Sequence, residues 1–159
     1  MKAAVVTVSD GVAAGERDDA SGRLLVELLQ AEHFDVEHRV VPDERPQIAA
    51  AIRELARTAR LVLTTGGTGV SPRDFTPEAT ESVVERPVPG IAEALRADAI
   101  RQTPHGLLGR GVAGVRGQSL IVNLPGSPGG CRDGFLLIKP ALEHALRLIA
   151  GDQTDHVQT

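Results

Sequence analysis

Short apolar segments rich in β-branched residues alternate with longer amphipathic segments along this chain. The short segments Ala3–Val8, Asp35–Val41 and Leu61–Thr65 each end at a polar or glycine-containing turn, a pattern typical of strands. The segments between them carry apolar residues at helical spacing, and parallel strands need crossover connections of a dozen or more residues. We therefore predict a three-layer α/β fold, with a mostly parallel sheet and helices on both of its faces.

The second half of the chain adds one hairpin to this pattern. Val112–Arg116 and Ser119–Asn123 flank the pair Gly117-Gln118, which predicts two antiparallel strands joined by a two-residue turn. The predicted helix starts share a capping hydroxyl or a proline in the first turn, and they are Ser21, Pro46, Thr76, Pro89 and Pro140. The segment that opens at Pro140 is expected to be the last helix.

The length of the chain fits one domain. It has 159 residues, of which we assign 1–150 to a single domain and 151–159 to a polar tail. A domain of this size can build a hydrophobic core without covalent cross-links. The single cysteine, Cys131, cannot form an internal disulfide, which excludes a disulfide-dense secreted scaffold.

Charge and aromatic content exclude two classes of partner. The chain has 17 basic and 21 acidic residues, and a basic field is needed for non-specific binding of nucleic acid or of an anionic membrane. It has no Trp, no Tyr and three Phe, so stacking surfaces for single-stranded nucleic acid are nearly absent. No uncharged apolar stretch approaches the ~18 residues of a membrane span. We expect a cytoplasmic protein with neither nucleic acid nor membrane as a partner.

A glycine-rich loop follows the third predicted strand. Gly66, Gly67, Thr68 and Gly69 lie in succession, and backbone N–H groups of such a loop can converge on a phosphate or carboxylate. The loop is neither a Walker A sequence, since no Gly-Lys-Ser/Thr follows, nor the dinucleotide-binding glycine pattern. A tight turn between strand and helix, without any ligand, is the alternative interpretation.

Polar side chains follow the neighbouring strands at the same predicted edge of the sheet. Ser9 and Asp10 follow the first strand, Asp43 the second, and Asp74 closes the glycine-rich loop. The carboxylates of Asp43 and Asp74 could hold Mg²⁺ while substrate phosphates fill its remaining positions. Capping of turns or helices is the alternative role for each aspartate. Together on one edge, the two aspartates favour a metal and phosphate site.

A second loop rich in proline and glycine spans 123–130. It combines the amide of Asn123, the backbone of Gly126 and the hydroxyl of Ser127, a set that suits an anion or a flat polar heterocycle. A turn that merely closes the hairpin is the alternative. No spacing of histidines supports a zinc site, and no Gly-x-Ser-x-Gly sequence supports a nucleophilic serine.

Several of these segments together resemble the MoaB/Mog family of molybdenum cofactor biosynthesis, which includes the amino-terminal domain of gephyrin. The resemblance covers about residues 3–149. It is carried by a long signature and by three shorter segments in the same order, namely Thr64–Gly69 with Pro72–Asp74 and Thr76–Thr80, then Val8–Asp10, Asp19–Gly22 and Asn123–Pro128.

The resemblance implies an α/β domain that forms a homotrimer and adenylylates molybdopterin with Mg-ATP, releasing pyrophosphate. It implies that Asp43 and Asp74 are the catalytic and metal-binding aspartates. It further implies that nucleotide and phosphate are bound by Ser9, Asp10, Gly66, Gly67, Thr68 and Gly69. It implies that molybdopterin is bound by Asn123, Gly126 and Ser127.

The chain also departs from some family members. The loop after Asn123 leads quickly into the last helical segment, without the longer insertion of Mog-type enzymes. A carrier or scaffold trimer that binds molybdopterin without activating it is therefore the alternative function. Insertion of molybdate is a third and weaker alternative. A related domain of longer, multidomain proteins carries out that step, and we expect no room for such extra domains in this chain. Whether a molybdenum or a tungsten pathway is served stays open.

Overall fold

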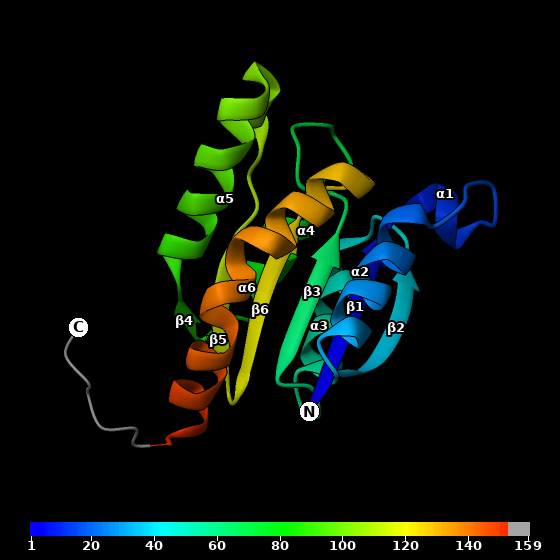
Figure 1. Ribbon diagram of the computed structural model, residues 1–159. Coiled ribbons are helices and arrows are strands. Elements are labelled where there is room, and N and C mark those ends of the chain that lie inside the picture. The colour runs from blue at the N-terminus through cyan, green and yellow to red at the C-terminus, as the bar shows by residue number, and fades with distance from the viewer. Residues whose placement is uncertain (153–159) are drawn as a thin grey trace.

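The computed structural model describes residues 1–152 and gives the chain a six-stranded sheet with helices on both faces (Figure 1). The predicted tail from residue 153 onward lies outside the described residues. The strands, in chain order, are β1 Lys2–Val8, β2 Asp35–Val41, β3 Leu61–Thr65, β4 Arg86–Pro87, β5 Ala113–Arg116 and β6 Ser119–Leu124. The helices are α1 Asp10–Ala13, α2 Ala20–Ala31, α3 Arg45–Leu55, α4 Thr76–Glu81, α5 Pro89–Gln102, the 3₁₀ helix η1 Pro104–Leu108 and α6 Pro128–Ala150.

The strand order β2-β1-β3-β6-β5-β4 confirms the predicted fold class. β2, β1, β3 and β6 run parallel, while β5 pairs antiparallel with β6 in the predicted hairpin. Gly117 turns this hairpin with a φ of 54°, a conformation that glycine adopts at little cost. The two-residue strand β4, which pairs antiparallel with β5, was not predicted because so short a segment carries no readable periodicity.

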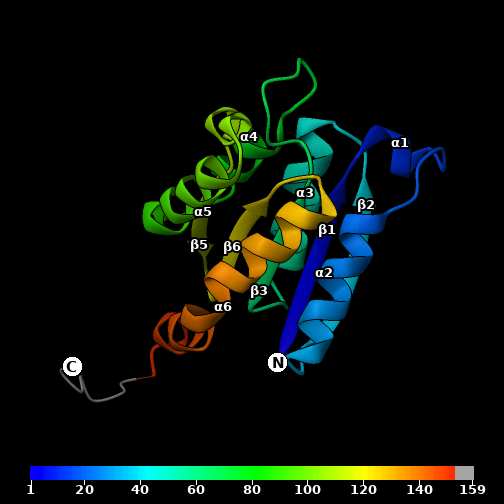
Figure 2. The same cartoon turned by 45° about the horizontal axis from the view of Figure 1, so that its top comes forward.

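Alternating residues of the central strands supply two hydrophobic cores. Figure 2 shows the layers that enclose them, with α2 and α6 in front of the sheet and α3 behind it. Ala3 and Val5 of β1 face α2 and α6, where Leu25 and Phe135 are fully buried. The intervening residues of β1 face α3 and α4 instead. Burial on both faces explains why the central strands are continuous apolar runs rather than alternating ones.

Three predicted helix starts are corrected by the structure. Asp19, not Ser21, caps α2, and its carboxylate accepts from the N–H of Gly22. Phe75 is the N-cap of α4, so Thr76 is already the first helical residue. Pro140 does not open the last helix but lies inside α6, which begins at Pro128 with Ser127 as its cap.

The proline inside α6 is tolerated for a local reason. Pro140 lacks an N–H and so leaves the carbonyl of Leu136 without its intrahelical donor. Leu136 is 51% exposed, so water can reach this part of the helix. In the described part of the chain, none of the helices is long and apolar enough to cross a membrane.

The carboxyl ends of the four parallel strands meet at one edge of the sheet. Val8 of β1 pairs with Val41 of β2, and Thr65 of β3 pairs with Leu124 of β6. The loops that follow these residues therefore converge, as expected for ligand sites in parallel sheets.

Candidate functional site

An acidic cavity of about 410 Å³ lies at the carboxyl ends of β1 and β3, beside the start of α2. Both predicted catalytic aspartates, Asp43 and Asp74, line it, together with Ser9 and the glycines Gly66 and Gly67. Among residues 1–152, the lining residues are Thr7, Val8, Ser9, Val12, Arg17, Asp18, Asp19, Ala20, Ser21, Asp43, Thr65, Gly66, Gly67, Asp74, Gly126 and Pro128.

Asp43 is held in place by a reciprocal pair of hydrogen bonds with Asp10. The N–H of Asp10 donates to Oδ2 of Asp43 at 2.8 Å, and the N–H of Asp43 donates to Oδ1 of Asp10 at 2.9 Å. Partial burial, and then the charges of Asp10 and Asp74, raise the pKa of Asp43 above its usual value. The ionised form of Asp43 is thus destabilised in the folded protein. A cation bound beside it would stabilise that form.

Asp10 supports the site rather than lining the cavity. Arg73 donates to both of its carboxylate oxygens, at 2.7 Å and 3.2 Å, and also to Glu44 at 2.9 Å. The hydrogen bond from Arg73, followed by the bond from Asp43, lowers the pKa of Asp10. With its carboxylate engaged, Asp10 acts through the position of Asp43.

The glycine-rich loop adopts a backbone that requires glycine at two positions. Gly66 has a φ of 95° and Gly67 a φ of 66°, in the left-handed region. A Cβ on Gly66 would lie 2.3 Å from the carbonyl oxygen of Val8, and a Cβ on Gly67 would lie 2.4 Å from Oγ1 of Thr76. Thr76 in turn donates its hydroxyl to the carbonyl of Gly66. The loop is therefore locked against β1 and α4.

Arg110 fastens the rest of this loop. Its Nε donates to the carbonyl of Gly69 at 2.7 Å, its Nη2 to the carbonyl of Asp74 at 2.9 Å, and its backbone N–H to the carbonyl of Thr68 at 2.8 Å. Its third side-chain contact is an ion pair with Glu78 at the start of α4, which lowers the pKa of that carboxyl. Sequence reasoning missed Arg110, because nothing near it in the sequence reveals a partner 36 residues away.

The two aspartates fit a magnesium ion. Oδ2 of Asp43 accepts from Asp10, and Oδ2 of Asp74 accepts from the N–H of Ser71 at 3.0 Å. Within residues 1–152, Oδ1 of each aspartate has no hydrogen-bond donor from the protein. The same residues hold no group of three or more His, Cys, Asp or Glu that could bind a metal by themselves. Two free carboxylate oxygens beside room for water and phosphate suit Mg²⁺, which is commonly bound in this way.

The loop also offers unused backbone donors. Within residues 1–152, the N–H groups of Gly67, Thr68 and Gly69 donate to no protein acceptor. Gly67 lines the acidic cavity, whereas Thr68 lines a neighbouring one and Gly69 lies against Asp74. Free N–H groups in a glycine loop are suited to anions.

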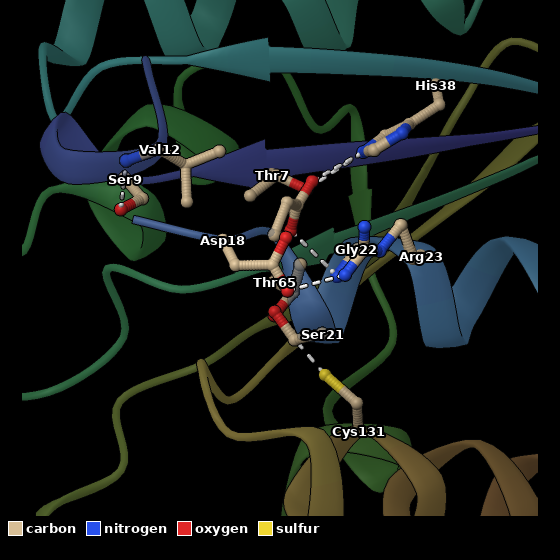
Figure 3. A network of polar contacts seen from close by, with 11 residues as sticks. Thr7, Ser9, Val12, Asp18, Ser21, Gly22, Arg23, His38, Thr65 and Cys131 are labelled. Atoms are coloured by element: carbon tan, nitrogen blue, oxygen red, sulfur yellow. Dashed lines mark hydrogen bonds and ion pairs between the residues drawn. The ribbon is translucent and has the colours of Figure 1, made fainter. Parts of the chain in front are cut away.

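A polar network that sequence reasoning did not assign includes Thr7, Ser21 and Thr65 from the lining of the acidic cavity (Figure 3). The hydroxyl of Thr7 donates to Oδ2 of Asp19 at 2.8 Å, and Nε2 of His38 lies 3.0 Å from both groups. Gly22 is required beside them, because a Cβ there would lie 2.2 Å from Oγ1 of Thr7. The carboxylate of Asp19 is thus fully engaged in capping α2 and joining β1 to β2.

A second part of the network brings Thr65, Ser21 and Cys131 together (Figure 3) and contacts the loop that follows β6. Thr65 Oγ1 lies 2.8 Å from the carbonyl of Pro125 and 3.0 Å from Oγ of Ser21. The thiol of Cys131 lies 3.1 Å from the same carbonyl, and burial raises its pKa to about 11. Cys131 is therefore a neutral structural thiol that holds Pro125 in place.

A second cavity, of about 480 Å³, lies on the other side of this loop between α5, η1, β6 and the start of α6. We call it the apolar cavity because Ala92, Leu95, Ala99 and Leu124 line much of it. Its remaining lining residues are Thr68, Arg96, Asp98, Gln102, Thr103, His105, Gly106, Gly109, Gly111, Asn123, Pro125, Ser127, Gly129, Gly130, Asp133 and Gly134.

The three residues predicted to bind molybdopterin are divided between the cavities. Asn123 and Ser127 line the apolar cavity, whereas Gly126 lines the acidic one. Asn123 uses both of its side-chain N–H groups inside the protein, on the hydroxyls of Thr64 at 3.0 Å and Thr80 at 2.9 Å. Ser127 caps α6 by accepting from the N–H of Gly130. The turn at 125–128 is the partition between the two cavities.

Comparison with known proteins places this architecture in a family. The family described as "Probable molybdopterin binding domain" matches residues 4–144. The chain belongs to this family. The resemblance to molybdenum cofactor biosynthesis proteins that the sequence predicted is therefore confirmed.

Individual relatives agree with this assignment. A protein named molybdopterin adenylyltransferase from Helicobacter pylori is 36% identical over 153 residues, which cover 93% of this chain and 87% of that protein. The molybdenum cofactor synthesis protein cinnamon of Drosophila melanogaster is 39% identical, but this chain spans only 25% of its length. The crystal structure of the molybdopterin biosynthesis enzyme MoaB from Thermus thermophilus superposes with a TM-score of 0.87 at 46% identity, covering 95% of this chain and 97% of that one.

Proposed function

We propose that this family member is a molybdopterin adenylyltransferase that uses Mg-ATP and acts in the cytoplasm. One observation carries the proposal: Asp43 and Asp74 face a single cavity together with Gly66 and Gly67. The name of the Helicobacter pylori relative, which this chain matches over nearly its full length, supports the same activity.

The proposed reaction joins two anions. The terminal phosphate of molybdopterin attacks the α-phosphorus of ATP, a new P–O bond forms, and the bond from that phosphorus to the bridging oxygen of the β-phosphate breaks. Pyrophosphate leaves and adenylylated molybdopterin remains. A phosphate monoester is already ionised near neutral pH, so the protein needs no strong general base, and its main tasks are positioning and charge neutralisation.

The residues of the acidic cavity suit those tasks. The free carboxylate oxygens of Asp43 and Asp74 would hold Mg²⁺, which when bound supplies positive charge to the triphosphate and the departing pyrophosphate. The unused N–H groups of Gly67 and Gly69 would orient phosphate oxygens at fixed positions. Asp10 and Arg73 keep Asp43 aligned without touching substrate.

We assign the flat rings of the substrates to the apolar cavity. Its walls are helix faces carrying small and aliphatic side chains, and its volume is in the range of ordinary ligand sites. Ser127 and Gly126 flank the partition, where a phosphate could pass from one cavity to the other. The 23-residue helix α6 starts at this partition and directs the positive end of its dipole there.

The test is an assay with ATP labelled at the α-phosphate and molybdopterin. Adenylyl transfer moves the label to molybdopterin and releases one pyrophosphate for each label transferred. Binding of molybdopterin without either product would overturn the enzymatic proposal in favour of the carrier. We also propose that the active species is a homotrimer, which light scattering checks as a mass three times 16.7 kDa.

A further inference from the structure

Within residues 1–152, one basic side chain lines the acidic cavity. Four of its lining residues are aspartates, Asp18, Asp19, Asp43 and Asp74, and Arg17 is the single lysine or arginine among them. A triphosphate brings several more negative charges into this space. A cation bound by Asp43 and Asp74 would offset only part of that charge. A further positive group at the cavity therefore strengthens binding of the triphosphate.

The other arginines near the site are already paired with carboxylates. Arg73 forms ion pairs with Asp10 at 2.7 Å and Glu44 at 2.9 Å. Arg110 pairs with Glu78 and donates to two loop carbonyls. Neither guanidinium is free to bind a substrate phosphate without breaking these contacts.

Arg17 differs from both. Within residues 1–152, its guanidinium takes part in no ion pair and no hydrogen bond. Three carboxylates lie within two positions of it in the sequence. Asp18 pairs with Arg23 at 2.5 Å and Asp19 with His38 at 3.0 Å, and within residues 1–152 Glu16 forms no ion pair with Arg17. The positive charge of Arg17 is therefore not neutralised by its neighbours.

The backbone holds Arg17 at the cavity wall. It lies in the segment between α1 and α2, where the chain leaves the carboxyl edge of the sheet (Figure 1). Its N–H donates to the carbonyl of Gly11 at 3.1 Å. Its side chain passes over Gly11, where a Cβ would lie 3.4 Å from Cβ of Arg17 and 3.9 Å from its Nε. These are ordinary van der Waals distances, so the side chain of Arg17 packs over the backbone of Gly11 beside the cavity that it lines.

We infer that Arg17 binds a phosphate group of the substrate in the acidic cavity. The planar guanidinium can donate two parallel hydrogen bonds to a phosphate, which adds geometric specificity to its charge. The inference rests on the proposed function and goes one residue beyond it. The phosphate comes either from ATP or from molybdopterin, and the experiment separates the two sources.

The experiment measures binding of Mg-ATP and of magnesium pyrophosphate by titration calorimetry. The variants are Arg17→Gln, Arg17→Lys and Arg53→Gln. Arg53 is an exposed residue near the end of α3, so its variant removes the same charge far from the cavity. If the phosphate is that of ATP, we expect Arg17→Gln to weaken binding about tenfold and Arg17→Lys to keep part of the affinity, while Arg53→Gln leaves it unchanged.

Steady-state kinetics then show which substrate carries the phosphate that Arg17 binds. A raised KM for ATP places Arg17 on the nucleotide, whereas a raised KM for molybdopterin alone places it on the pterin's phosphate, and both support a phosphate contact. If Arg17→Gln and Arg53→Gln bind both ligands as the wild type does and leave both KM values unchanged, the inference is wrong and the proposed function stands. If the wild type binds neither ligand and forms no product, the proposed function fails and the inference with it. The melting temperature of Arg17→Gln should equal that of the wild type, because Arg17 is exposed.

Discussion

The two cavities on either side of the 125–128 turn are lined by different kinds of secondary structure. The acidic cavity consists of loops at strand ends, and its polar groups are held by hydrogen bonds such as those between Asp43 and Asp10. The apolar cavity consists largely of helix faces, with Leu95 and Ala99 among its walls. Charged groups must be fixed within tenths of an ångström to act on a reacting phosphorus, whereas a ring needs matching apolar surface.

The difference extends to how firmly each wall is held. The glycine-rich loop is tied to β1 through Gly66, to α4 through Thr76 and to the segment before β5 through Arg110. By contrast, Ala92 is the single buried residue of α5, which forms one wall of the apolar cavity. The structure therefore predicts that loosening the fixed aspartates of the acidic cavity slows the chemical step, and that changes in the apolar cavity act on affinity.

The largest effect is expected from Asp74→Asn. The amide keeps the hydrogen bond from Ser71 but removes one of the two charges available to a metal ion. We expect kcat/KM for adenylyl transfer to fall by about 100-fold or more, with the melting temperature unchanged. Asp35→Asn, at the exposed start of β2 on the opposite edge of the sheet, is the matched control and should retain full activity. Equal turnover in the two variants would remove Asp74 from the mechanism.

The second effect concerns the fastening of the loop. Arg110→Lys keeps the charge but cannot reproduce contacts with Gly69, Asp74 and Glu78 at once. We expect a loss of about 2 kcal/mol in the free energy of unfolding, since hydrogen bonds from a charged group to half-buried partners are lost. If all of this free energy serves to hold Asp74 in its catalytic position, its loss lowers kcat/KM by up to about 30-fold.

Arg116→Lys is the control for this prediction. Arg116 also donates to a backbone carbonyl, that of Val83, and forms an ion pair with Glu85, but it lies at the end of β5 remote from the loop. Chemical denaturation and steady-state turnover are measured on both variants. If both lose stability and neither loses activity, Arg110 has no role in positioning Asp74.

The fold and the edge where the site lies could be predicted from the sequence. Buried parallel strands such as β3 are continuous apolar runs, and the residues after them, including Asp43 and Gly66, must converge at the carboxyl edge. This is a consequence of topology, so the strand pattern alone is sufficient. The hairpin followed equally from the glycine at 117.

What could not be predicted depends on contacts between distant segments. Asn123 carries the same amide whether it faces a ligand or bonds to Thr64 and Thr80, and only its surroundings distinguish the two. Pro140 has the signature of a helix start, yet helix α6 continues through it because packing of Phe135 and Leu142 on the sheet outweighs one lost hydrogen bond. Local patterns rank such possibilities but do not decide between them.

A change in the apolar cavity should separate affinity from chemistry. Ala99 lines that cavity, so Ala99→Leu fills part of it with three additional carbon atoms. We expect KM for molybdopterin to rise about tenfold, a loss typical of a crowded apolar pocket, with binding of magnesium pyrophosphate unchanged. Ala97→Leu, the same substitution on the exposed side of α5, should alter neither quantity. Weaker pyrophosphate binding in Ala99→Leu alone would show that the two cavities are not independent.

The smallest effect is one of stability, and it arises at Asp43. Burial and the charges of Asp10 and Asp74 raise its pKa in the folded state. Its contribution to stability is therefore complete below the ordinary pKa of a carboxyl group and is lost as the pH rises through the raised value. At neutral pH, Asp43→Asn removes a destabilised charge while keeping an acceptor for the N–H of Asp10.

We expect this variant to be slightly more stable than the wild type at pH 7, by no more than about 1 kcal/mol once solvent screening is included, and equally stable at pH 3. Thermal unfolding at both pH values measures the difference. Added Mg²⁺ should raise the melting temperature of the wild type and not that of Asp43→Asn, since ion binding stabilises only the protein that offers both carboxylates. A variant less stable than the wild type at pH 7 would mean that the Asp43 carboxylate serves the fold as well as the site.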